Sequence, residues 1–145
     1  MEPTALQAVE LMIGFSEIGL SGDTWSISKQ SVYDAIYELK PKYPDLFSDI
    51  FFSNHTLRPY STSIESALST LMTVGLMYMD SPKFKNIFVG KKAKDDFIPY
   101  LSSCVSKDIF LLGKEAAKDF DKIILKISSE NNICGIIEKE NNCHK

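Results

Sequence analysis

The chain has 145 residues, 44% of them hydrophobic and 24% charged, which suits one globular domain and excludes a disordered or collagen-like chain. Its 16 basic and 19 acidic residues give a net charge of −3, which argues against a nucleic-acid binder that is basic throughout. The charge is unevenly placed, because residues 1–80 contain four basic and ten acidic residues, whereas residues 81–94 contain five lysines and no acid. This short basic segment is the first functional signal in the sequence.

The N-terminus and the cysteines bear on the compartment. Residues 1–4 lack the basic stretch with which a secretory signal begins, and no apolar run approaches the roughly 20 residues of a membrane span. The three cysteines, Cys104, Cys134 and Cys143, are too widely spaced for a metal knuckle and too few for a disulfide framework. We therefore expect a soluble cytoplasmic protein that needs no cofactor or metal and does not associate with a membrane.

Two helices are predicted in the first third of the chain. Apolar residues recur at helical spacing after Pro3, which predicts a helix over residues 4–18 with an apolar stripe wide enough for a dimer seam. Glycines and a polar turn then end this helix. Ser28 is a suitable N-cap for a second helix over residues 29–40, which Pro41 ends.

The third predicted helix begins with a capping box formed by Thr62 and Glu65, and Gly75 is placed to end it in a left-handed conformation. Its apolar stripe faces inward. Its outer face carries small hydroxyl side chains: Ser63, Ser66, Ser69 and Thr70. Residues 76–79 and 85–89 are predicted strands joined by a proline turn.

Two further helices are expected after the strands. One covers residues 91–101 and is kinked or ended by Pro99, and the other covers residues 107–127. A polar break at residues 129–132 ends the pattern. We therefore expect a single domain over residues 1–128 and a flexible tail over residues 129–145.

The order of helix, helix, polar-faced helix, strand, turn and strand is that of a winged helix-turn-helix. Residues 63–78, SIESALSTLMTVGLMY, are similar to the pattern x-ϕ-x-x-A-L-x-x-L-x-x-x-G-L-ϕ of the third helix and first wing strand in many bacterial and archaeal winged-helix proteins. Residues 87–94 resemble the strand and T-x-x-G-K stretch that often follow a wing. The resemblance covers about residues 28–98 and implies a mainly α (α+β) fold, a winged helix-turn-helix with additional N- and C-terminal helices.

The resemblance implies that the outer face of the third helix and the wing bind DNA or a protein partner. Small hydroxyl side chains can approach a groove and donate to phosphates. No Arg, Asn or Gln, the usual base-reading residues, lies between Tyr60 and Lys85, which favours non-specific contact or a protein interface. The lysines of the basic segment suit phosphate or an acidic partner surface, although a solvated patch is the alternative: Lys83, Lys85, Lys91, Lys92 and Lys94.

No nucleophile, metal-ligand or phosphate-loop pattern is present in the sequence, so we expect no enzyme and no small-molecule substrate. The acidic body and long flanking helices resemble the winged-helix accessory subunits of ABC- or SMC-type ATPases, including the middle components of bacterial three-component defence systems. This resemblance implies a non-catalytic adaptor that binds a larger ATPase or nuclease subunit, or a second copy of itself, with or without a contact to the DNA backbone. The alternative is a dimeric DNA-binding transcriptional repressor.

Overall fold

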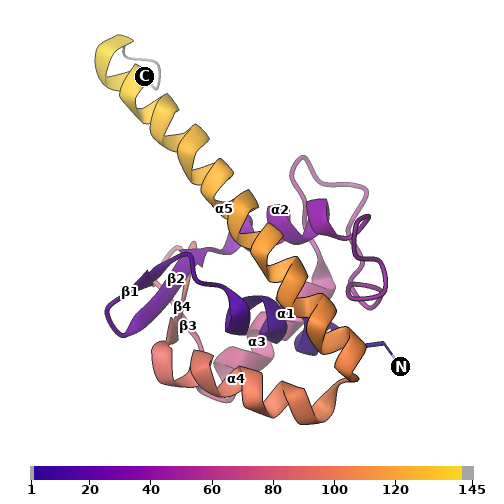
Figure 1. Cartoon of the computed structure of the whole chain (residues 1–145). Helices are drawn as coiled ribbons and strands as arrows, with labels where there is room; N and C mark the ends of the chain where they lie inside the picture. The colour runs from indigo at the N-terminus through magenta and orange to yellow at the C-terminus, as the bar shows by residue number, and fades with distance from the viewer. Residues whose placement is uncertain (1, 142–145) are drawn as a thin grey trace.

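The computed structural model describes residues 2–141, with side chains for residues 2–129. Within this part of the chain there are five helices and a small antiparallel sheet, and the sheet lies at one side of the helical body (Figure 1). In chain order the elements are α1 (Ala5–Phe15), β1 (Leu20–Ser21), β2 (Thr24–Ser28), α2 (Lys29–Leu39), α3 (Thr62–Thr73), β3 (Tyr78–Met79), β4 (Asn86–Gly90), α4 (Lys91–Cys104) and α5 (Lys107–Asn141). None of the helices in the described residues is long and apolar enough to cross a membrane.

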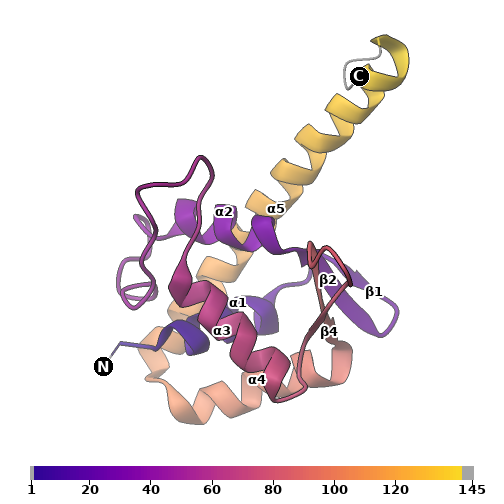
Figure 2. The same cartoon turned by 180° about the vertical axis from the view of Figure 1, so that it is seen from behind.

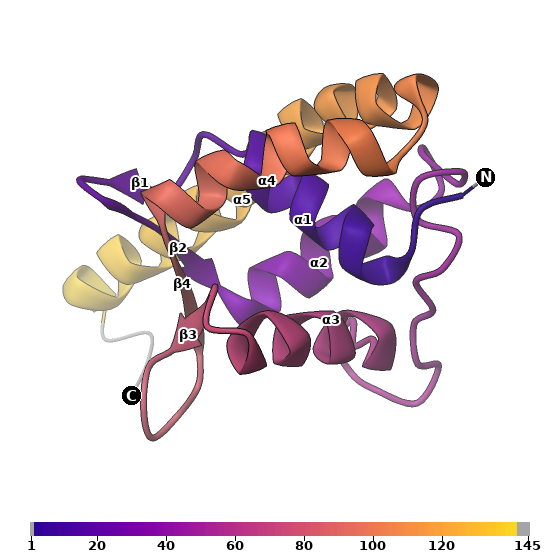
Figure 3. The same cartoon turned by 90° about the horizontal axis from the view of Figure 1, so that it is seen from below.

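Helix α1 lies at the centre of the molecule, with α3 on one side and α4 and α5 on the other (Figure 3). Residues 8–14 are all buried, and all of them except Glu10 are apolar or glycine, as expected for a helix covered on every side. The wide apolar stripe predicted for this helix is thus covered by the chain itself. It is not available as the seam of a dimer, because α3, α4 and α5 already occupy it.

The sheet has the strand order β1-β2-β4-β3, with every neighbouring pair antiparallel. Trp25 pairs with Val89 and Ile27 pairs with Ile87, and these four alternate side chains are buried in the core. The predicted strands of residues 76–79 and 85–89 are confirmed in outline. The hairpin of β1 and β2 was not predicted. Gly22 has a φ of 60° in its two-residue loop, a conformation that favours glycine.

The ends of the α2 and α3 helices follow local sequence signals. Ser28 is the N-cap of α2, as predicted, and its hydroxyl accepts a hydrogen bond of 3.1 Å from the backbone N–H of Ser31. Gly75 follows α3 with a φ of 80°, which confirms the predicted left-handed end.

The predicted start of α3 is wrong by one residue. The N-cap is Ser61, whose buried hydroxyl accepts a hydrogen bond of 3.2 Å from the backbone N–H of Ile64. Thr62 is therefore already inside the helix and forms no capping box. The carboxylate of Glu65 instead receives the ammonium of Lys29 at 3.3 Å and the hydroxyl of Tyr33, so it joins α3 to α2.

Helix α5 packs on α1 and then extends beyond the body of the molecule (Figures 1 and 2). Its inner face is buried at Ile109, Ala116, Phe120 and Ile124. The helix continues through residues 129–132, where a break was expected, because none of these residues is a proline or glycine that would force an end. Residues 142–145 of the expected tail lie outside the described residues.

Candidate functional site

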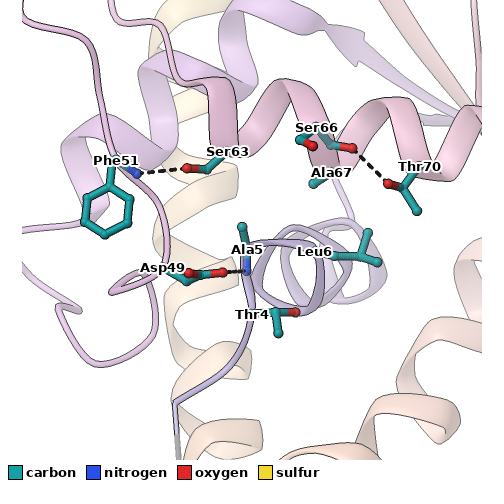
Figure 4. A pocket seen from close by; sticks show the side chains of 9 residues that line it. All are labelled: Thr4, Ala5, Leu6, Asp49, Phe51, Ser63, Ser66, Ala67 and Thr70. Carbon is teal, nitrogen blue, oxygen red and sulfur yellow. Dashed lines mark hydrogen bonds between the residues drawn. The ribbon is translucent and has the colours of Figure 1, made fainter.

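A groove of about 370 Å³ runs between α3, the N-terminus of α1 and the loop that precedes Phe52 (Figure 4). Three of the four predicted residues on the outer face of α3 line it, namely Ser63, Ser66 and Thr70. Ser69 is exposed on α3 outside the groove. The remaining lining residues are Thr4, Ala5, Leu6, Asp49, Phe51 and Ala67.

Hydrogen bonds fix three sides of the groove. The carboxylate of Asp49 accepts the backbone N–H of Ala5 at 2.7 Å, in the first turn of α1, where a negative charge is favourable. On α3, the Ser63 hydroxyl accepts a bond of 3.3 Å from the backbone N–H of Phe51. These bonds tie the loop to both helices, so the groove is a formed feature of the fold.

The hydroxyl groups of α3 differ in what they can still bind. Thr70 donates its hydroxyl to the backbone carbonyl of Ser66 at 3.0 Å, and Thr73 donates to that of Ser69 at 2.9 Å. Their donors are satisfied within the helix and are not directed at a phosphate. The Ser66 hydroxyl has no hydrogen-bond partner among the described side chains and backbone groups, and it faces the groove (Figure 4).

The groove carries no positive charge. Among the nine residues that line it, only Asp49 is charged, and its charge is negative. A phosphate backbone would be repelled by this carboxylate and would find no ammonium or guanidinium to replace its counterions. The hydrogen-bond donors of a protein surface suit the Asp49 carboxylate and the hydroxyl groups of the groove better than phosphate oxygens do.

Four apolar side chains are exposed between the C-terminal end of α3 and β3, and two of them, Leu76 and Tyr78, line one pocket. Met72 and Leu76 are each 37% exposed, Val74 is 61% exposed and Tyr78 is 59% exposed. The Tyr78 ring stacks on Phe88 with 5.0 Å between ring centroids, which holds it on this surface. Clustered apolar side chains on a soluble surface are typical of protein interaction sites.

The structure divides the five predicted lysines into three groups. Lys83 and Lys85 are exposed in the loop between β3 and β4, and Lys92 is exposed on the first turn of α4. Lys91 is paired with Asp95, with 2.7 Å between Nζ and Oδ2, and this hydrogen bond lowers the pKa of the Asp95 carboxyl. Three of the five are therefore exposed without an ion-pair partner among the described side chains.

Lys94 is a buried residue, which corrects its assignment to the binding surface. Its position on α4 shares one helix face with Phe97 and Leu101, and this face packs on the core. The Nζ atom of Lys94 donates to the backbone carbonyl of Gly14 at 3.0 Å, and burial lowers the pKa of its ammonium. Gly14 lies in the last turn of α1, where a backbone carbonyl has no N–H donor within the helix. Lys94 supplies the missing donor.

No sequence pattern marks Asp49 or Phe51 as site residues. Both lie in a loop without a motif, and they reach the groove only because α1 packs against α3. Comparison of the chain with family models, with curated proteins and with solved structures found no match.

Proposed function

We propose that the chain is a winged-helix adaptor that binds a protein partner through α3 and carries out no catalysis itself. The helices α1, α2 and α3, followed by the antiparallel strands β3 and β4 and their connecting loop, have the element order of a winged helix-turn-helix. The antiparallel pairing of β3 with β4 supports this proposal, because the β3–β4 loop, which follows the third helix, would correspond to the wing.

The observation that carries the proposal is the chemistry of the α3 surface. The groove has hydroxyl groups and one carboxylate, and the exposed apolar side chains of Met72, Val74 and Leu76 follow at the C-terminal end of the same helix and just after it. A protein surface can supply both the hydrogen-bond donors and the apolar contacts that such a face requires. A nucleic acid would need cations, and the groove has none among its lining residues.

The resemblance of the sequence to accessory subunits of ATPase complexes suggests the class of partner. We infer a larger ATPase or nuclease subunit in a bacterial or phage-related system, on which any chemistry would take place. The residues of the adaptor would then bind and orient that larger subunit.

The test is the variant Ser66→Trp, because Ser66 is exposed and faces the groove without contributing to the core. We expect tagged wild-type protein to recover a larger partner from the native host, and Ser66→Trp to reduce that recovery at least about tenfold, as the loss of a well-packed contact does. Ser102→Trp, at an exposed position on α4, is the matched control. Equal recovery by both variants, or recovery of a lone homodimer, contradicts the proposal.

A dimeric repressor remains a second candidate because Lys83 and Lys85 are exposed in the β3–β4 loop and Lys92 is exposed on the first turn of α4. A repressor needs duplex binding that depends on base sequence. We expect Lys85→Glu with Lys92→Glu to abolish such binding if this function is the correct one. Duplex binding without sequence preference, measured by competition between unrelated duplexes, excludes it.

A further inference from the structure

The outer face of α5 carries a regular row of lysines that lies outside the predicted wing. Lys114, Lys118, Lys122 and Lys126 are all exposed and follow one another at intervals of four residues. A rise of about 1.5 Å per residue places successive lysines about 6 Å apart along the axis, and the row is about 18 Å long. We call these four residues the lysine stripe.

The fold makes this face basic although the sequence is nearly neutral. Residues 109–129 contain four lysines and three acids. Two of the acids bind the body of the molecule. Asp119 accepts from the Lys42 ammonium and the Tyr43 hydroxyl, each at 2.6 Å, and Asp121 accepts from the Ser16 hydroxyl at 2.6 Å and the Glu17 N–H at 2.9 Å.

Glu115 is left as the exposed acid of this stretch. None of the four lysines of the stripe is within ion-pair distance of a carboxylate among the described side chains. Four ammonium groups therefore face solvent on one helix, with one carboxylate between them.

We propose that the lysine stripe binds the phosphate backbone of duplex nucleic acid without sequence preference. A duplex carries one negative charge per about 1.7 Å of axis when both strands are counted, so a duplex segment as long as the row, about 18 Å, carries about ten phosphates. Lysine is a point charge that suits phosphate oxygens. Residues 109–129 contain no Arg, Asn or Gln that could read a base edge.

A membrane surface fits α5 less well than a duplex. Binding to a membrane surface requires an apolar helix face that can enter the headgroup region. The apolar face of α5 is already buried against the body at Ile109, Ala116 and Phe120. The exposed Leu111 and Leu125 lie 14 residues apart in sequence, about 21 Å along the helix, and form no continuous apolar surface.

The lysine stripe is separate from the proposed protein-binding groove. Helix α5 lies in front in Figure 1 and α3 lies in front in the reverse view of Figure 2, with α1 between them (Figure 3). A duplex on the outer face of α5 would therefore leave the groove open. This inference goes beyond the proposed function and does not depend on it.

The experiment measures binding of the full chain to two short fluorescent duplexes of unrelated sequence by anisotropy. We expect equal affinity for both and a plot of log K against log salt with a slope near −3.6, which is a loss of about 150-fold between 50 and 200 mM salt. Each Lys→Gln substitution in the stripe should lower the steepness of that slope by about 0.9, and the quadruple variant should lose binding. Gln preserves helix propensity, so circular dichroism should be unchanged.

The control for total charge replaces Lys83, Lys85 and Lys92, the lysines of the alternative duplex contact, by Gln. If the lysine stripe is the contact, the affinity of this variant should stay within about twofold of the wild type, since these lysines lie off α5. Absence of duplex binding at low salt overturns the proposal, as does a quadruple variant that binds like the wild type. Loss of binding in the control alone would assign the duplex contact to the wing, which also overturns the proposal. Stronger binding to anionic vesicles or to polyglutamate than to duplex also overturns the proposal, because the ligand of the stripe would then be a membrane or an acidic protein.

Discussion

At the scale of single residues, Glu10 is an acid in unfavourable surroundings. Its side chain is only 7% exposed on the central helix α1, and burial raises the pKa of its carboxyl. The ionised form therefore costs stability at neutral pH. That cost disappears as the pH falls through the raised pKa, because the folded protein then holds the neutral acid.

We expect Glu10→Gln to raise Tm at neutral pH by a few degrees, because the amide keeps the size of the side chain and has no charge to desolvate. At about pH 4 the two proteins should melt at similar temperatures, since Glu10 is then protonated in the folded state. Thermal unfolding followed by circular dichroism measures the difference. Glu38→Gln, at an exposed position of α2, is the control, and a Glu10 variant that melts like the wild type at neutral pH contradicts the prediction.

Lys94 gives a second prediction at this scale, since the structure assigns it to stability and not to binding. Lys94→Met should lower the free energy of unfolding by about 1–3 kcal/mol, because the Gly14 carbonyl loses its buried donor. Lys92→Met, two residues away and exposed, should change it by less than about 0.5 kcal/mol. Urea denaturation measures both. Equal effects would mean that the buried contact contributes nothing.

At the scale of elements, the sequence predicts what depends on near neighbours in the chain. Ser28 as an N-cap and Gly75 as a helix end were predicted because each acts on the backbone of its own turn. The strand β4 was also predicted from near neighbours, because Ile87 and Val89 alternate with residues that point to the other face. The strand at residues 20–21 was missed because two residues are too few for any periodic pattern.

The candidate site could not be predicted as a groove because its parts are distant in sequence. Residues 4–6, residues 49–51 and the outer face of α3 meet only when α1 packs on α3. The burial of Lys94 depends in the same way on where α4 docks against Gly14. Periodicity shows which residues share a face, but which neighbour covers that face is set by tertiary packing.

The cap of α3 gives a prediction that separates neighbouring positions. Ser61→Ala should destabilise the protein by about 1 kcal/mol, because the backbone N–H of Ile64 loses its acceptor in a buried position. Thr62→Ala should change stability by less than about 0.5 kcal/mol, since Thr62 is exposed inside the first turn. Chemical denaturation of the two variants decides between the two cap assignments. A larger loss of stability for Thr62→Ala than for Ser61→Ala would support the capping box predicted from the sequence.

At the scale of the whole molecule, the net charge of −3 is a sum over faces that differ in chemistry. The face of α3 has hydroxyl groups, one carboxylate and apolar side chains, and the outer face of α5 has four lysines. The central helix α1 holds these faces on opposite sides of a single core (Figure 3). An adaptor needs two surfaces that can be occupied at the same time, and this arrangement provides them.

The separation of the two faces predicts that their functions are lost independently. Ser66→Trp should abolish recovery of the protein partner and leave duplex affinity and its salt slope unchanged, because a bulky side chain in the groove does not reach α5. The Lys→Gln variant of the lysine stripe should lose duplex binding and recover the partner as the wild type does. Anisotropy and co-purification of all three proteins measure both effects. If either variant loses both activities while its circular dichroism and Tm match the wild type, one shared surface serves both ligands. The two-faced adaptor is then wrong, because α1 would not keep the two binding events apart.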